Sequence, residues 1–275
     1  MIRPFLLAAL FVSGATLALA QDGTVILTNG LQVPLGDVKP NGADLEMTKE
    51  AAGLIVGQKI PAAAIDVINV SRPAAFVQAM AKILDGAPAE APGIVEPIRA
   101  QYEPFVAFRG NLWHEAMRIK LIAFGVAGDK GALDTTISMV MRQKPGLEET
   151  ATIELAHALA ETAKKSEERL NQLKAFIGDN RTPTTNAIAQ YFIAETLAGN
   201  KKDEEALEAY LRVPSIMPVC DPVVLAASQI RAAQRIQRLG PDYKKEAAQL
   251  YRWAVRAVPG TTFGTTAESS LKDLQ

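Results

Sequence analysis

Two helical patterns joined by a short polar turn occupy residues 186–218, and no other stretch constrains the fold of this chain as much. Apolar side chains recur at helical and not at strand spacing on both sides of the turn at Gly199–Lys202. The second helix is expected to begin with Asp203 as its N-cap, and Pro214 is expected to cut that helix short. Each helix has an apolar face that must be covered by other helices. A mainly α-helical fold follows from this pattern.

The helix pair recurs along the chain. The second helices of successive pairs are predicted to end near four prolines at intervals of 38, 35 and 41 residues, namely Pro145, Pro183, Pro218 and Pro259. Intervals of this length are typical of helical solenoids, whose repeats must stack to bury a shared core. An irregular bundle with evenly spaced prolines is the alternative. Earlier helices are predicted over 74–84, 94–108 and 112–127, and the last of these is apolar almost all round, as in the centre of a bundle.

Residues 186–218 resemble a tetratricopeptide repeat. Ala206, Tyr210 and Pro218 match the small residue, the aromatic residue and the terminal proline of that motif's second helix. The next pair repeats them as Ala247, Tyr251 and Pro259, whereas the first helix has Ala194 and Leu197 where the family prefers Gly and Tyr. The resemblance implies an α-solenoid in which Tyr210 and Tyr251 are buried between helices. It also implies a binding scaffold that has no reaction of its own.

Residues 22–72 alternate with a period of two and predict a small β-domain ahead of the helical domain at 73–275. Asn29-Gly30 predicts a type I′ hairpin turn, residues 39–42 predict a second turn, and 54–60 and 65–70 predict further strands. The order of strands and turns resembles the SH3-like and Sm-like barrels of bacterial envelope proteins, which implies an antiparallel half-barrel. Four basic and six acidic residues, without interleaved aromatics, argue against nucleic-acid binding.

Residues 1–20 have the pattern of a secretory signal peptide. Arg3 supplies the positive start, an apolar stretch follows, and Ala18-Leu19-Ala20 is a small-x-small cleavage site before Gln21. A membrane anchor is the alternative, but Ser13, Gly14 and Thr16 interrupt the apolar stretch, which is short for a bilayer span. We therefore expect an exported protein, periplasmic or secreted, that has no integral membrane span once the signal is removed.

Catalytic and metal-binding patterns are missing from the sequence. Cys220 is the only cysteine, and the only histidines, His114 and His157, have neither cysteine partners nor a zinc-binding spacing. Cys220 lies in a turn where Asp221 and Pro222 are predicted to be the N-cap and the first residue of a helix, so its thiol is expected to be inert. The sequence predicts no enzyme, no metal site and no cofactor.

The C-terminal residues 222–275 carry eight basic and four acidic side chains. Arg231, Arg235 and Arg238 are spaced i, i+4, i+7 along one predicted helix, and Arg252 and Arg256 lie on the next. A solvated surface would explain this spacing, and so would a surface that binds an anionic partner. The sequence thus predicts a non-enzymatic scaffold that binds protein or peptide partners. The alternative is a module that binds cell-wall or other anionic surface polymers through this basic face.

Overall fold

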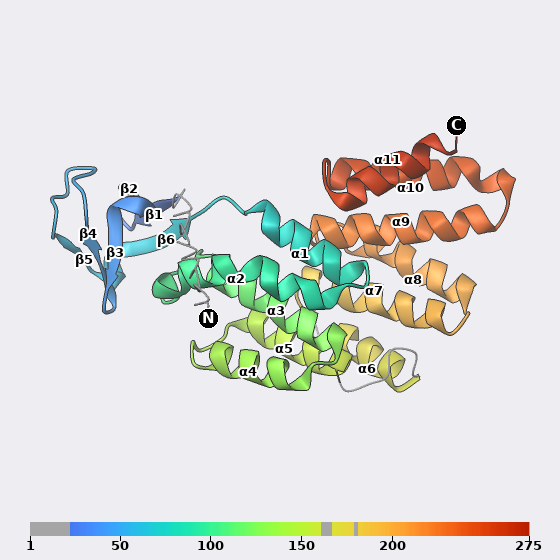
Figure 1. The fold of residues 1–275 in the computed structure, drawn as a ribbon, viewed down its shortest axis with the longest axis horizontal. Coiled ribbons are helices and arrows are strands. Elements are labelled where there is room, and N and C mark those ends of the chain that lie inside the picture. The colour runs from blue at the N-terminus through green and yellow to red at the C-terminus, as the bar shows by residue number, and fades with distance from the viewer. Residues whose placement is uncertain (1–22, 161–166, 179–180, 275) are drawn as a thin grey trace, which may run out of the picture. The chain divides into compact units, whose positions relative to one another are not determined.

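The computed structural model describes residues 23–160, 167–178 and 181–274. The predicted signal peptide, residues 1–20, lies outside the described residues. The chain divides into two compact units, Met1–Asn69 and Val70–Gln275. The first unit is built of short strands and the second of helices (Figure 1).

The N-terminal unit contains two three-stranded antiparallel sheets, ordered β2-β1-β6 and β3-β4-β5. Two short 3-10 helices, Leu35–Asp37 and Ala62–Ala64, precede β3 and β6. Alternating apolar side chains such as Val25, Leu45 and Ile68 are buried, as expected for half-buried strands. The strands are β1 (Thr24–Leu27), β2 (Gln32–Pro34), β3 (Val38–Asn41), β4 (Asp44–Met47), β5 (Lys59–Ile60) and β6 (Ile65–Asn69).

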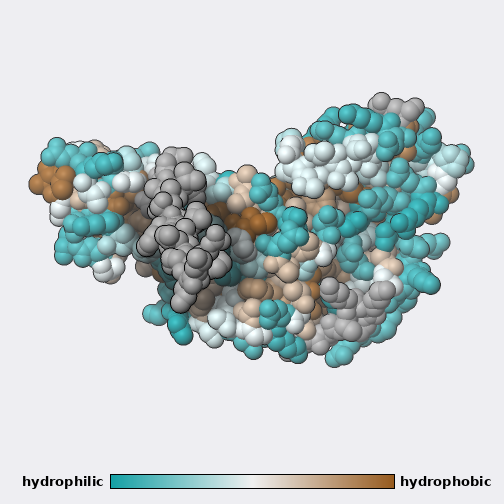
Figure 2. All heavy atoms as spheres, in the orientation of Figure 1, coloured by the Kyte–Doolittle hydropathy of each residue, from teal (hydrophilic) through white to brown (hydrophobic). Residues whose placement is uncertain are grey.

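Three local predictions for this unit were wrong. The β1–β2 turn is not type I′, because only Gly30, with φ at 84°, has positive φ there, while the Asn29 side chain accepts a hydrogen bond from the Leu31 N–H. The turn predicted at 39–42 lies at 42–43 instead, because residues 39–41 belong to β3, an edge strand that tolerates Pro40. Most of 54–60 is a loop that exposes Ile55 and Val56, and Figure 2 shows a brown patch over it.

The C-terminal unit is helical, and the mainly α-helical fold class is confirmed. Short 3-10 turns lie at Pro88–Glu90, Glu103–Phe105 and Pro241–Tyr243. The α-helices in its described part are α1 (Ala74–Leu84), α2 (Ala91–Tyr102), α3 (Trp113–Ala127), α4 (Lys130–Met141), α5 (Leu147–Ala160), α6 (Glu167–Gly178), α7 (Pro183–Gly199), α8 (Asp203–Ile216), α9 (Pro222–Arg238), α10 (Lys244–Ala257) and α11 (Thr262–Lys272). No helix among the described residues is long and apolar enough to cross a membrane.

Helix boundaries follow local sequence signals closely in some places. The predicted helix at 74–84 is α1, and the side chain of Asp221 accepts a hydrogen bond from the Val223 N–H as the N-cap of α9, so both predictions are confirmed. Helices α4, α6, α8 and α10 end shortly before the four evenly spaced prolines. Pro214, however, does not cut α8 short, because it lies in the last turn and the helix continues to Ile216. Asp203 is the first residue of α8 and not its N-cap.

Helices α1, α3, α5, α7 and α9 pack in a closed cycle, which we call the helix ring. Each contacts the next, and α9 packs back against α1. The Tyr191 hydroxyl of α7, fully buried, donates a 2.8 Å hydrogen bond to the carbonyl of Leu84 at the end of α1. Gly125 of α3 lies directly against the backbone of Ala156 of α5. Helices α2, α4, α6 and α8 lie between successive ring helices in the chain and pack against them, and α10 packs against α9 and α11.

Candidate binding sites

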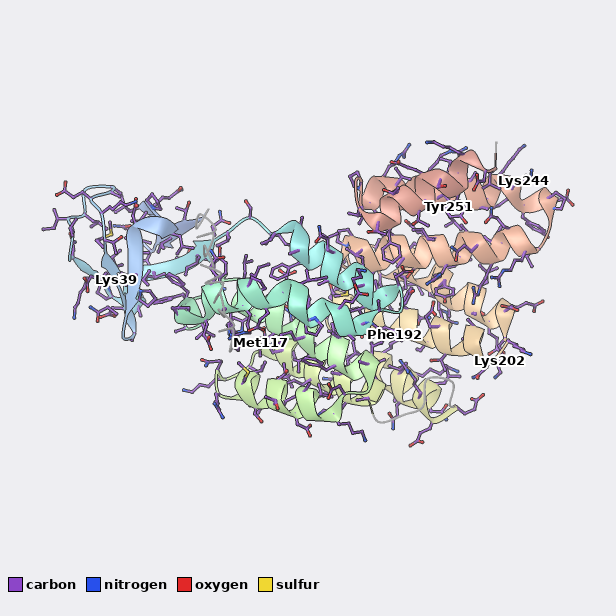
Figure 3. The ribbon with its side chains drawn as sticks, in the orientation of Figure 1. Lys39, Met117, Phe192, Lys202, Lys244 and Tyr251 are labelled. Carbon is purple, nitrogen blue, oxygen red and sulfur yellow. The ribbon has the colours of Figure 1, made fainter. Side chains whose placement is uncertain are left out.

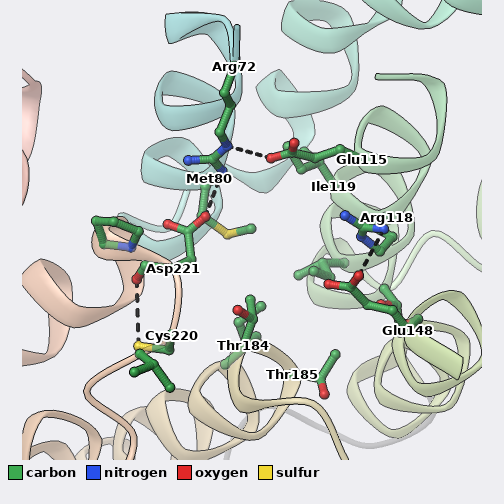
Figure 4. Close-up of a pocket in the computed structure, with 15 residues that line it drawn as sticks. Arg72, Met80, Glu115, Arg118, Ile119, Glu148, Thr184, Thr185, Cys220 and Asp221 are labelled. Atoms are coloured by element: carbon green, nitrogen blue, oxygen red, sulfur yellow. Dashed lines mark hydrogen bonds and ion pairs between the residues drawn. The ribbon is translucent and has the colours of Figure 1, made fainter. Parts of the chain in front are cut away.

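A cavity of about 300 Å³ lies at one end of the helix ring, and we call it the ring cavity (Figure 4). Every ring helix contributes to its lining, with Met80, Ile119, Thr152, Ile188 and Pro222 coming from α1, α3, α5, α7 and α9. The first turns of α5, α7 and α9 all reach it, because the residues that line it there lie at the start of each helix. The cavity therefore combines an apolar lining with several helix N-termini, whose dipoles favour negative charge.

Charged side chains at the ring cavity neutralise one another. Arg72 donates from Nε to Glu115 and from Nη2 to Asp221, both at 2.6 Å. Burial lowers the pKa of the Arg72 guanidinium, but the charges of Asp221 and Glu115 outweigh burial and hold that pKa above its usual value. Bidentate bridging of this kind fixes the ends of α3 and α9 together.

Arg118 forms a second bridge at the ring cavity, with Glu148 at 3.3 Å and Glu149 at 3.0 Å. Glu149 also accepts a hydrogen bond from the Gly146 N–H at the start of α5. Burial raises the pKa of the Glu149 carboxyl, but a backbone hydrogen bond and Arg118 outweigh burial and hold it below its usual value. The four carboxylates named at the ring cavity are thus committed to arginines or helix starts. Among the described residues no cluster of three or more ligands could hold a metal ion.

The thiol at the ring cavity is poorly suited to nucleophilic chemistry. Cys220 is buried, and burial together with the charge of Asp221 raises the pKa of its thiol to about 12. His114 lies instead at the start of α3, where Nε2 is 3.2 Å from the Val106 carbonyl, and His157 is half-buried in α5. No hydrogen bond between described residues joins either histidine to Cys220. Cys220 thus has no neighbouring histidine among the described residues to activate its thiol.

The predicted partner-binding arginines of α9 differ in their surroundings. Arg231 lies 3.5 Å from carboxylate oxygens of Glu195 and of Asp85. Arg235 stacks on the ring of Tyr210, 5.1 Å from its centre, and only 12% of its side chain is exposed. Spacing alone could not reveal this, because the acidic and aromatic partners come from α7, from α8 and from the residue that follows α1. Only Arg238 of the three is exposed.

The five predicted arginines do not form one patch. Arg231 lines a cavity between α1 and α7, Arg235 and Arg238 line a groove between α8 and α9, and Arg252 lines a third cavity beside α11. Arg256 is exposed on α10. Arg231 and Arg235 of α9 thus pair with carboxylates, whereas Arg238 of α9 and Arg252 and Arg256 of α10 are exposed.

The groove between α8 and α9, which we call the α8–α9 groove, has a volume of about 650 Å³. Its apolar wall consists of Leu207 and Leu211 of α8 and of Leu239 and Tyr243, which follow α9. Leu239 is 55% exposed and Tyr243 is 46% exposed. The charged rim is made of Asp203, Glu204, Glu208, Arg235 and Arg238. Sequence reasoning missed this groove, although a leucine and a tyrosine flanking Gly240-Pro241 were a visible signal.

The residues assigned to repeat packing lie in two environments. Ala206, Ala247, Tyr210 and Tyr251 are buried, whereas Pro218 and Pro259 are exposed after their helices. The Tyr210 hydroxyl bonds to the carboxylate of Glu195, and the Tyr251 hydroxyl donates a 2.8 Å hydrogen bond to Gln237 Oε1. Each tyrosine thus links the second helix of a pair to the helix before it.

No protein-family model, curated protein or solved structure matches this chain. Inferences about its function rest on the chemistry of the sites described above.

Proposed function

We propose that the chain is an exported, non-enzymatic scaffold that binds a protein or peptide partner on its helical unit. Export is supported by the signal-like residues 1–20. The alternation of helix pairs, their proline-spaced ends and the buried Tyr210 and Tyr251 support a tetratricopeptide-like solenoid. It would be a solenoid that closes on itself, because α9 packs back against α1. The two small antiparallel sheets of the N-terminal unit support an SH3-like or Sm-like half-barrel in front of it.

The observation that carries this proposal is the exposed apolar wall of the α8–α9 groove. Leu239 and Tyr243 leave about half of their surface in water, while Leu207 and Leu211 form the wall opposite. Apolar surface gathered in a concave site with a charged rim is typical of protein recognition, because removing apolar surface from water lowers the free energy. The arrangement suits an amphipathic helix whose apolar side chains enter the groove.

The charged rim indicates which charges the partner should carry. Asp203 is partly neutralised by Arg235, whose nearest nitrogen is 3.9 Å away, whereas Glu204 and Glu208 lie on the α8 side and Arg238 on the α9 side. A segment with basic residues along one edge and an acidic residue along the other would complement both sides.

Site-specific photo-crosslinking in the native cell envelope tests the proposal. A photoreactive residue at position 239 or 243 is expected to give one discrete adduct, because both positions face the groove. The matched control is position 141, where Met141 is 57% exposed on α4, outside the groove. Adducts that form equally at 141 would contradict the proposal.

A second measurement separates binding from folding. For this measurement the photoreactive residue is placed at position 207, on the opposite wall of the groove. Leu239→Asp and Tyr243→Asp should each abolish the adduct formed from position 207 and leave the thermal midpoint near that of the wild type. Both replaced side chains are already about half exposed, so little core packing is lost. Met141→Asp should leave the adduct unchanged. Retention of the adduct in both groove variants would refute the assignment of this groove.

A further inference from the structure

The outer face of α10 carries a basic stripe. Lys245, Gln249, Arg252 and Arg256 are spaced i, i+4, i+7, i+11, which places them on one side of the helix. The three cations of the stripe are exposed. Lys244, labelled in Figure 3, is exposed at the first residue of the same helix. Among the described residues no ion pair joins any of these four cations to a carboxylate, and Arg252 Nη1 instead donates to Gln249 Oε1 at 3.0 Å.

The opposite face of α10 fixes the orientation of the stripe. Ala247, Leu250, Tyr251 and Ala254 are buried, and the helix packs against α9 and α11. The stripe therefore cannot turn inward to find partners, as Arg231 and Arg235 of α9 do. Hydrophilic residues dominate the surface over this end of the unit (Figure 2). The cations of α10 form a fixed positive surface.

Apolar side chains flank the stripe. Trp253 follows Arg252 and is 44% exposed. On the other side, Leu271 and Leu274 line a cavity of about 500 Å³ together with Lys244, Lys245 and Arg252, and no acidic side chain of the described chain lines it. Cations beside an exposed tryptophan and two leucines match a membrane interface, where anionic headgroups lie above apolar chains. A hydrated soluble polymer offers nothing to the apolar side chains.

We propose that this face of α10 binds an anionic phospholipid surface and holds the helical unit at a membrane without crossing it. The lysines at the start of α10 oppose the positive end of the helix dipole, a local cost that an anionic headgroup would offset. Each cation near such a surface contributes roughly a fivefold increase in partitioning, and the attraction falls off within a Debye length. This inference goes beyond the partner scaffold and does not depend on the α8–α9 groove.

The first test is co-sedimentation of the purified protein with vesicles of phosphatidylglycerol mixed with phosphatidylcholine. Binding is expected to these vesicles and not to phosphatidylcholine alone, and it should weaken as salt rises. Replacing Lys245, Arg252 and Arg256 together by Glu should lower the partition coefficient by at least about 100-fold. The matched control replaces three exposed cations of the α4 region by Glu, namely Lys130, Arg142 and Lys144. If both triple variants lost vesicle binding equally, binding would depend on net charge alone, and the assignment of the lipid-binding face to α10 would be overturned.

The second test separates lipid from soluble polyanion. In the Trp113→Phe variant the remaining tryptophan is Trp253, and its fluorescence should shift to the blue on vesicle binding, because the indole leaves water. Trp253→Ala should retain binding at low salt and lose more of it than the wild type at high salt. Polyphosphate in place of vesicles should give weaker binding and no spectral shift. Polyphosphate binding as tight as vesicle binding, with the emission of Trp253 unshifted in both, would assign the face to a soluble anionic polymer and refute the lipid proposal.

Discussion

Replacing Gly125 by alanine tests the close contact between α3 and α5. A Cβ atom at this position would lie 2.6 Å from the carbonyl oxygen and 2.9 Å from the Cα of Ala156 in α5. Both are backbone atoms, so no side-chain rotation can relieve the overlap, and α3 and α5 must move apart. Overpacking of this kind costs about 1–3 kcal/mol, and a rigid backbone contact lies toward the upper end. Alanine recovers about 1 kcal/mol of helix propensity. The expected net loss is about 2 kcal/mol.

The matched control is Gly93→Ala in α2, where an added Cβ would meet no heavy atom within 4 Å. This variant should gain about 0.5–1 kcal/mol, because only the propensity term remains. Urea denaturation followed by helical circular dichroism measures both variants. If Gly125→Ala were as stable as Gly93→Ala, the close approach of α3 and α5 would be refuted.

Three further predictions concern buried side chains. Tyr210→Ala and Tyr251→Ala should each lower the free energy of unfolding by about 3–5 kcal/mol in denaturant melts, and a loss below about 1 kcal/mol would contradict their burial. Because the folded pKa of Glu149 lies below 4.5, its contribution is complete above that pH and is lost as the pH falls through the folded pKa. Glu149→Gln should therefore be less sensitive than the wild type to acid below pH 4.5, measured as thermal midpoint against pH. Cys220, with a thiol pKa of about 12, should resist iodoacetamide at pH 8 until the protein is unfolded, and rapid labelling of the native protein would refute this.

Local patterns in the sequence were sufficient to predict most helices, but not what the faces of those helices meet. The limits of α1 and the capping of α9 by Asp221 depend on neighbouring residues, so they could be predicted. Even so, the Asn29-Gly30 turn was assigned the wrong type, because a three-residue loop with one left-handed glycine uses the same residues as a type I′ turn.

Long-range contacts account for the rest. The spacing of Arg231 and Arg235 predicts a shared face of α9, yet it cannot say that Glu195 and Tyr210 lie opposite that face. The ring cavity likewise assembles residues from five helices, and Arg72 and Asp221 are 149 positions apart in the chain. Such contacts depend on how the helices wind, which periodicity alone does not specify.

The closed cycle of ring helices has a consequence for the order of folding. In an open array each helix pair touches only its neighbours, so folding can start anywhere and spread, and an end can fray by itself. Here α1 packs against α9, and Tyr191 bonds to the end of α1 from 107 residues away. Helix α1 therefore stays partly uncovered until α9, in the last third of the chain, has formed. Contacts between segments so far apart in the sequence raise the contact order and slow folding. Because every helix of the cycle packs against two other ring helices, none of them can unfold separately. The unit should therefore melt in a single cooperative transition.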